Sequence, residues 1–214
     1  MIQKSLILGS SSIDRKNLLE SLKIDFKIII SEYEEVIDEK ISPEKLAMNL
    51  AETKLNKIFE KIEELKKKDK WKSILNQYFI IITADTIVYH NGTIIGKAKN
   101  KNHAFEILKT LSGKMHELIT GFTVYDSETN EIIKDYSKTQ VFFKNLSDEE
   151  ILDYINNSNE YFNRAGAYSL RERASLFISE IRGSSSNVIG LPLEKIYEVL
   201  KKFKFNILKI KEKN

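Results

Sequence analysis

The sequence contains no cysteine, and it has only three histidines and two prolines among 214 residues. Without cysteine, the chain can form no disulfide, no thiolate metal site and no cysteine nucleophile. Three histidines also argue against a histidine-rich metal site. Any bound metal is therefore expected to be a hard divalent ion held by oxygen atoms, such as Mg²⁺ or Mn²⁺.

Long apolar runs are missing as well. No run approaches the roughly 20 residues of a membrane helix. The apolar stretch at 6–8 is too short for the core of a signal peptide. We therefore expect a cytoplasmic protein with no membrane partner.

Charge of one sign is not in large excess, because 34 basic residues face 31 acidic ones and the net charge is +3. This near balance does not indicate a nucleic-acid partner. The basic clusters at 66–68 and 201–213 are rich in lysine and interspersed with acidic residues. We interpret them as solvated surface, with a nucleic-acid patch as the alternative.

The length and patterning predict a single domain over 1–214, with a charged insertion at about 62–77 and a basic tail at about 201–214. In the first half we expect a buried strand at 4–9, a serine-rich turn, a helix at 14–22, a second strand at 26–30 and a helix that starts near Pro43. The run at 78–83 is apolar on both faces and predicts a central strand that ends at Ala84-Asp85-Thr86.

The second half alternates hairpins and helices. Asn91-Gly92 predicts a hairpin turn, and Ser147 with Glu150 predicts a capped helix at 148–156. The other expected elements are a helix at 102–111, paired strands at 117–125 and 132–143, a strand near 175–181, a small-residue loop at 183–187 and a helix at 193–203. The fold class is therefore α/β with a mixed sheet flanked by helices.

Two polar clusters lie where apolar elements end. Gly9-Ser10-Ser11-Ser12, with Arg15 behind it, offers backbone N–H groups, hydroxyls and a guanidinium, which together suit phosphate. The alternative is a serine helix cap with Arg15 on the surface. Asp85 is suited to activating water or binding a metal, although it could equally cap the turn into Thr86.

Two further clusters are weaker signals. Lys97 follows the predicted hairpin and could bring a cation to the same crevice as Asp85, whereas most lysines are simply solvated. His116 and Thr120 belong to the strand near 117, and a lone histidine is more often structural than catalytic. No Walker, dinucleotide-binding or nucleophile-elbow pattern is present. Taken alone, the residues indicate an α/β protein that binds an anion.

In their order along the chain, these clusters resemble the Maf family of nucleoside triphosphate pyrophosphatases. The resemblance covers residues 5 to 200. It rests on Leu8-Gly9-Ser10-Ser11-Ser12-Ile13-Asp14-Arg15, Leu50-Ala51-Glu52-Thr53-Lys54, Ala84-Asp85-Thr86, Gly96-Lys97, Leu111-Ser112-Gly113-Lys114-Met115-His116, Ala165-Gly166-Ala167-Tyr168 and the stretch from Gly183 to Leu193.

The resemblance implies an elongated, Maf-like (ITPase-like) mixed sheet with two lobes and a deep cleft between them. It implies attack of water on the α-phosphorus, with Asp85 as the proton acceptor. Glu35 and Asp85 would hold a divalent metal, either Mg, Mn or Co. A nucleoside triphosphate is the implied partner, and a homodimer is compatible with the family. The implied substrate-binding residues are Ser10, Ser12, Arg15, Lys54 and Lys97.

Three positions are implied to set substrate specificity: Asp14, Thr86 and Arg171. Asp14 replaces an arginine of the family pattern and would repel a phosphate. Arg171 replaces a glutamine in the branch that acts on dTTP and UTP, and it offers hydrogen-bond donors only. The expected substrate is dTTP, UTP or a modified nucleotide. The alternative suggested by Asp14 and Arg171 is a non-catalytic, nucleotide-binding regulator of cell division.

Overall fold

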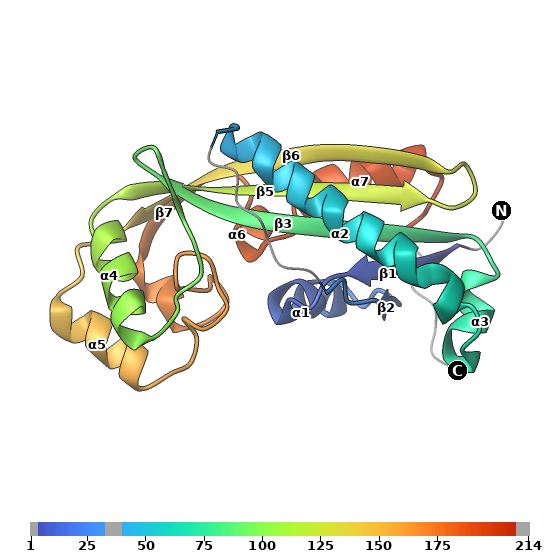
Figure 1. Cartoon of the computed structure of the whole chain (residues 1–214). Helices are drawn as coiled ribbons and strands as arrows, with labels where there is room; N and C mark the ends of the chain where they lie inside the picture. Colours follow the sequence, from blue (N-terminus) through green and yellow to red (C-terminus); the bar gives the residue numbers. More distant parts are fainter. Residues whose placement is uncertain (1–3, 33–39, 209–214) are drawn as a thin grey trace.

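A computed structural model describes residues 4–32 and 40–208 and shows one mixed β-sheet flanked by helices (Figure 1). Within the described residues the sheet has seven strands, in the order β2-β1-β3-β5-β6-β7, with β4 paired to β3. The strands are β1 (Ser5–Gly9), β2 (Lys27–Ile28), β3 (Phe79–His90), β4 (Thr93–Ile95), β5 (Met115–Asp126), β6 (Glu131–Phe143) and β7 (Ile178–Arg182).

Strand β1 runs parallel to both of its neighbours, β2 and β3, and all the other pairs are antiparallel. The mixed α/β prediction is therefore confirmed. The helices are α1 (Ile13–Ser21), α2 (Pro43–Leu65), α3 (Asp69–Leu75), α4 (Lys101–Leu111), α5 (Asp148–Asn156), α6 (Ser185–Ile189) and α7 (Leu193–Lys202), with a 3-10 turn at Arg173–Phe177.

Alternate residues of the central strands face two different helical layers. Ile7 and Ile81 pack against Leu55 and Ile58 of α2. The intervening residues, such as Leu8 and Ile82, belong to the core that includes α1 and α7. This alternation follows from the two-residue period of a strand, and it explains why the run at 78–83 is apolar on both faces.

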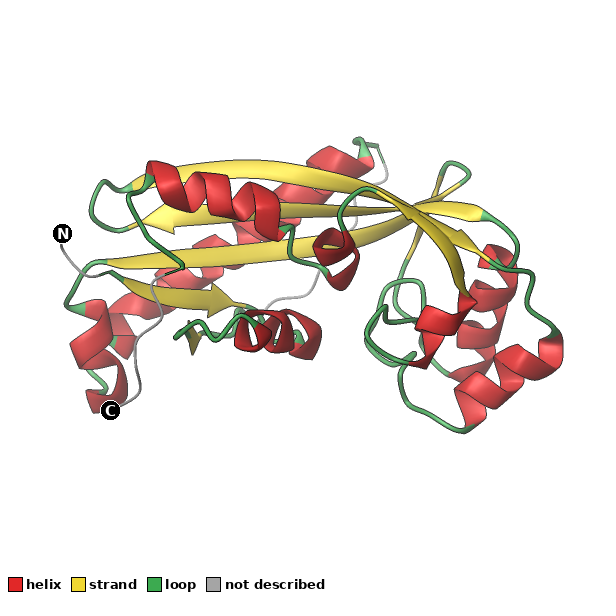
Figure 2. Ribbon diagram, turned by 180° about the vertical axis from the view of Figure 1, so that it is seen from behind, coloured by secondary structure: helices red, strands yellow, loops and turns green. Residues whose placement is uncertain are grey.

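The sheet is long and twisted, and its far end carries a separate group of helices. Figures 1 and 2 show α4, α5 and the 3-10 turn gathered at the end of β5 and β6 that lies away from α3. Their buried side chains form one hydrophobic cluster, in which Leu108 and Ile151 pack with Val141 and Phe177.

Several local predictions are confirmed. The turn of the predicted hairpin lies at Asn91 and Gly92. Both residues have positive φ, as the two central residues of a type I′ turn require. Ser147 and Glu150 form the predicted capping box. Pro43 opens α2 behind the N-cap Ser42.

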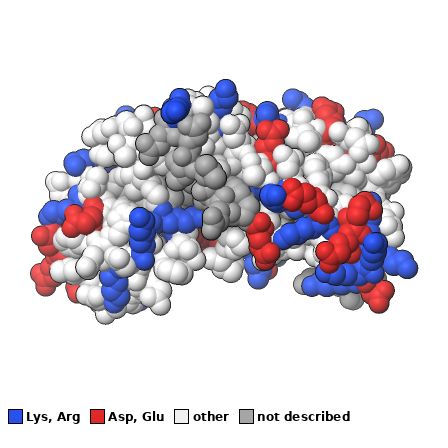
Figure 3. Space-filling model, viewed as in Figure 1, with Lys and Arg blue, Asp and Glu red and all other residues white. Residues whose placement is uncertain are grey.

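Other boundaries were predicted incorrectly. The second strand covers only Lys27–Ile28, residues 173–177 form a 3-10 turn before β7, and the small-residue loop at 183–187 already contains the start of α6. The charged segment at 62–77 is helical, but it is not only an exposed extension, because Ile62 and Leu75 are buried in the core beneath α2. Basic and acidic side chains are mixed on the exposed side of this region, as Figure 3 shows, and Lys66 pairs there with Glu63 and Lys68 with Glu64.

The prediction that the central strand ends at Asp85 is also wrong. Strand β3 continues to His90, and Asp85 lies in its middle, opposite Gly121 of β5. The strand that ends here is β1, whose last residue, Gly9, pairs with Thr83. The apolar run stops where β1 stops, because β3 beyond Thr83 no longer has β1 beside it. One edge of β3 is thereby open at Asp85.

Candidate active site

A cavity of about 920 Å³ lies at this open edge of β3, between the start of α1 and the segment 159–172. Most of the residues predicted from sequence to belong to the site line it. They are Ser10, Ser12, Asp14, Arg15, Lys54, Asp85, Thr86 and Lys97. Residues scattered over the first half of the chain therefore meet in one place.

Asp85 is 6 % exposed and points toward α2, where its Oδ1 atom accepts an ion-paired hydrogen bond from Lys54 Nζ. Lys54 also lies 3.5 Å from the carbonyl oxygen of Ala84. Gly121, the partner of Asp85 in β5, allows this approach, because a Cβ atom there would overlap the backbone of Ala47 and Met48 in α2. The glycine thus brings α2, and with it Lys54, close to the carboxylate.

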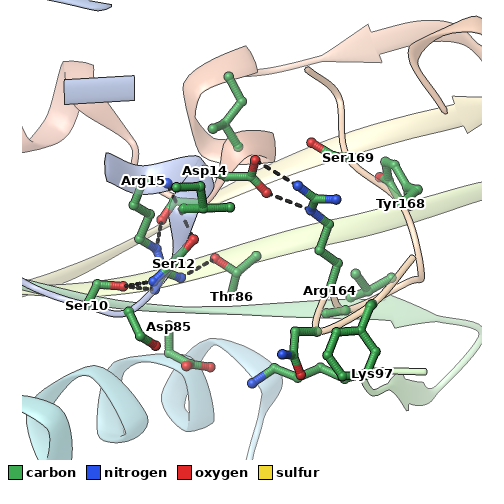
Figure 4. A pocket seen from close by; sticks show the side chains of 18 of the residues that line it. Ser10, Ser12, Asp14, Arg15, Asp85, Thr86, Lys97, Arg164, Tyr168 and Ser169 are labelled. Carbon is green, nitrogen blue, oxygen red and sulfur yellow. Dashed lines mark hydrogen bonds and ion pairs between the residues drawn. The ribbon is translucent and has the colours of Figure 1, made fainter. Parts of the chain in front are cut away.

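Arg15 approaches the same edge of β3 from the opposite face of the sheet and is only 7 % exposed. Its Nη1 atom donates to the carbonyl oxygen of Ala84 at 2.9 Å and its Nη2 atom to Thr86 Oγ1 at 3.0 Å. Its Nε atom donates to the carbonyl oxygen of Gly190 at 2.6 Å. The alternative of a surface arginine is therefore wrong. Arg15 joins α1, β3 and the segment that follows α6, and Figure 4 shows this arrangement.

The hydroxyl groups of the serine-rich turn accept hydrogen bonds from nearby backbone N–H groups. Ser12 is the N-cap of α1 and accepts from the backbone N–H of Arg15. Ser10 Oγ accepts from the N–H of Ser12 at 3.1 Å and from Arg15 Nη1 at 3.2 Å. The helix-cap interpretation is thus correct for Ser12. It is compatible with anion binding, because the turn also lines the cavity and α1 directs its N-terminus there.

Lys97 follows β4 and is held by a backbone bridge to Ala165. Figure 4 shows its side chain extending into the cavity on the side where Asp85 lies. Lys54, Lys97 and Arg15 therefore bring three cations to a cavity that also contains the Asp85 carboxylate.

Asp14 forms an ion pair with a residue that the sequence analysis did not single out, Arg164. Arg164 Nε donates to Asp14 Oδ2 at 2.8 Å, and Nη2 donates to Asp14 Oδ1 at 3.2 Å (Figure 4). The same guanidinium donates to both carboxylate oxygens of Glu172, at 3.0 and 3.1 Å. The negative charge of Asp14 is thus partly offset within the protein by a guanidinium that it shares with Glu172. No local pattern marks Arg164, because its partner lies 150 positions away.

The other two predicted specificity positions are placed differently. Thr86 lines the cavity and exchanges a hydrogen bond of 2.9 Å with Thr120. Arg171 is exposed and is not among the residues that line the cavity, whereas its neighbour Glu172 is. Glu35, the second predicted metal ligand, lies outside the described residues.

The surroundings of His116 agree with the interpretation that a lone histidine is structural and not catalytic. It is buried, and its Nε2 atom lies 2.8 Å from Tyr168 Oη. Burial, with a smaller contribution from the neighbouring His90, lowers the pKa of His116 to about 3. The ring is therefore neutral near pH 7 and supports Tyr168, which lines the cavity.

The described residues include no group of three or more His, Asp or Glu side chains placed to hold a metal ion. A divalent cation of the Mg²⁺ type does not require such a group, since it is commonly held by one or two carboxylates together with substrate phosphates and water. The Asp85 carboxylate fits this mode. No helix among the described residues has the length and apolar character needed to cross a membrane.

Comparison with known proteins connects this site to one family. The family model described as "Maf-like protein" matches residues 5–203. A protein of Caldicellulosiruptor saccharolyticus named dTTP/UTP pyrophosphatase is 40% identical over 96% of this chain and 98% of its own length. A protein of the same name from Alkaliphilus metalliredigens is 43% identical over 95% of this chain and 98% of its own length. The chain therefore belongs to the Maf-like protein family.

Proposed function

We propose that this protein hydrolyses a nucleoside triphosphate to the monophosphate and pyrophosphate, with dTTP and UTP as the first substrates to test. The observation that carries this proposal is the buried Asp85 carboxylate beside Lys54, in one cavity with Arg15 and Lys97. The names of the relatives support the same reaction and the same pair of substrates. A modified nucleotide remains a further candidate substrate within this proposal.

Charge complementarity supports a triphosphate as the ligand. A triphosphate brings about four negative charges near neutral pH, and cleavage between the α- and β-phosphorus atoms places more charge on the leaving pyrophosphate. Lys54, Lys97 and Arg15 lie where they can offset this charge. Cations fixed in a partly buried cavity stabilise such a transition state more than mobile solvent does.

In the proposed reaction a water molecule attacks the α-phosphorus. The oxygen of the water forms the new P–O bond, the bond from the α-phosphorus to the bridging oxygen breaks, and pyrophosphate leaves with that oxygen. Asp85 accepts the proton that the water loses. Lys54, which donates to Asp85, keeps this carboxylate in place and contributes positive charge beside the reacting phosphate.

A divalent cation such as Mg²⁺, Mn²⁺ or Co²⁺ belongs to this proposal. Asp85 is the described residue that would hold it. When bound, such a cation polarises phosphate oxygens and offsets their charge. A cytoplasmic location, expected from the sequence, and a homodimeric assembly, compatible with the family, likewise remain proposals.

The test is pyrophosphate release from natural and modified triphosphates with Mg²⁺, Mn²⁺ and Co²⁺, measured for the wild type and for Asp85→Asn. We expect Asp85→Asn to lower turnover by at least about 100-fold, with little change in the thermal unfolding midpoint. Full activity in Asp85→Asn would refute the assigned role.

The non-catalytic alternative rested on Asp14 and Arg171. The pairing of Asp14 with Arg164 weakens that motivation, because the carboxylate does not face the cavity as an isolated charge. Tight nucleotide binding without turnover across the whole panel would favour the alternative.

A further inference from the structure

One aromatic ring on the cavity wall is unusually exposed. Phe162 is 57 % exposed, yet it lines the cavity. The other described aromatic residue that lines the cavity, Tyr168, is only 5 % exposed, and its hydroxyl lies within hydrogen-bond distance of His116. Among the described cavity residues, Phe162 is therefore the aromatic ring presented for contact with a ligand.

The backbone that carries this ring is fixed from both sides. Phe162 forms a bridge with Ala98, and Ala165 forms one with Lys97. The N–H of Phe162 donates to the carbonyl oxygen of Asn159 at 3.0 Å. These contacts bring the backbone of Phe162 alongside the backbone segment of Lys97 and Ala98, and both Phe162 and Lys97 line the cavity.

Arg164 fixes the same segment to α1. A guanidinium has five N–H donors. Those of Arg164 go to Asp14, to Glu172 and, at 2.5 Å, to the carbonyl oxygen of Glu160. Arg164 is thereby engaged in holding the wall and acts as a positioning residue for the segment that carries Phe162.

The charges set the direction in which a nucleotide would lie. Asp14 and Glu172 share the single positive charge of Arg164, so this part of the wall is net acidic and disfavours phosphate. Lys54 and Arg15 lie near Asp85 at the open edge of β3. The triphosphate should therefore occupy the edge of β3, and the remainder of the ligand should extend toward segment 159–172.

We propose that Phe162 is a substrate-binding residue that stacks on the nucleobase, in a wall positioned by Arg164. This inference rests on the proposed function for its ligand, a nucleoside triphosphate. Stacking of a base on an aromatic ring tolerates different bases, because every base has a π-face. Phe162 thus contributes affinity for a base without selecting among bases.

The test compares UTP with inorganic tripolyphosphate, which has the phosphates but no base. The variants are Phe162→Ala and Phe162→Trp, with Leu176→Ala as the control for loss of an exposed apolar side chain outside the cavity lining. Phe162→Ala should raise the KM for UTP by about 5- to 150-fold. It should leave inhibition by tripolyphosphate within about twofold, and Phe162→Trp should retain UTP affinity. Leu176→Ala should match the wild type in both measurements.

Binding of a non-hydrolysable α,β-imido analogue of UTP, measured by calorimetry, separates this inference from the proposed reaction. The stacking role is refuted if Phe162→Ala weakens binding of the analogue and of tripolyphosphate equally. It is also refuted if Phe162→Ala weakens binding of neither ligand. Both results would hold even when wild-type turnover is normal. If no triphosphate is turned over but only the analogue loses affinity in Phe162→Ala, the proposed reaction fails and the base-stacking role stands.

Discussion

Asp14 and Arg164 form a bidentate ion pair that connects the first turn of α1 to the segment before Tyr168, across 150 positions of sequence. Their side chains are only 14% and 15% exposed, and Glu172 shares the same guanidinium. The pair therefore closes one wall of the proposed substrate cavity and partly offsets the charge of Asp14.

Removing the guanidinium should destabilise the protein. Arg164→Leu leaves two carboxylates without their cation in a partly buried place, and we expect a loss of about 2–4 kcal/mol in the free energy of unfolding. Arg164→Lys should recover only part of this loss, because the ammonium of lysine lacks the planar set of donors with which a guanidinium binds two carboxylates at once. Urea denaturation measures both changes.

A double-mutant cycle tests the pairing itself. In the Arg164→Leu background, Asp14→Asn should cost less than it does in the wild type, or should stabilise the protein, because it removes a charge that has lost its partner. Additive effects would contradict the ion pair. Arg182→Leu, which breaks the solvent-exposed pair with Glu180, is the matched control and should leave the unfolding midpoint unchanged.

This ion pair shows where sequence reasoning reached its limit. Asp14 could be recognised as an unusual residue, and the repulsion expected from it follows from its charge alone. Its partner could not be found, because no short motif links positions 14 and 164. The long hairpin, the capping box and the mixed sheet were predictable, since each depends on local turn chemistry or on the period of apolar residues.

Asp85 shows a different limit. The end of an apolar run marked its location, but the run ends because β1 stops beside β3, and only the pairing register reveals this. The convergence of Lys54 and Arg15 from opposite faces of the sheet depends on that open edge. The residues were therefore predictable from family resemblance, whereas the geometry that unites them required the fold.

Gly121 should be indispensable for that geometry. In Gly121→Ala the new methyl group would overlap the backbone of Ala47 and Met48, and neither can move without shifting α2. We expect a loss of about 3 kcal/mol in unfolding free energy and reduced turnover, because α2 carries Lys54. Gly96→Ala is the matched control, since a Cβ atom there meets nothing within 4 Å. Equal unfolding midpoints for the two variants would contradict the close-approach argument.

Lys54 should matter more for turnover than for folding. Lys54→Met keeps most of the side-chain volume but removes the cation beside Asp85. We expect kcat/KM to fall by about 100- to 1,000-fold, together with weaker inhibition by tripolyphosphate. Lys57→Met, in the same helix but paired with Glu60 on the surface, should behave like the wild type. Wild-type kinetics in Lys54→Met would remove this lysine from the proposed mechanism.

The burial of His116 predicts a specific dependence of stability on pH. Its pKa in the folded protein is lowered from 6.5 to about 3 by burial and, to a smaller extent, by His90. In the unfolded chain the imidazole takes up a proton below pH 6.5, whereas in the folded protein it stays neutral. The stabilising contribution is therefore complete above pH 6.5 and is lost as the pH falls toward 3.

Between pH 7 and pH 5 this one group should account for about 2 kcal/mol of lost unfolding free energy. His116→Gln keeps a side chain that can hydrogen-bond to Tyr168 but cannot titrate. Between pH 7 and pH 5 its unfolding free energy should therefore fall by about 2 kcal/mol less than that of the wild type. Urea denaturation at pH 7, 6 and 5 gives the pH dependence for wild type and for His116→Gln, and equal slopes for the two proteins would show that the buried imidazole is not the group responsible. Because the comparison uses slopes, it remains valid even if His116→Gln lowers stability at every pH.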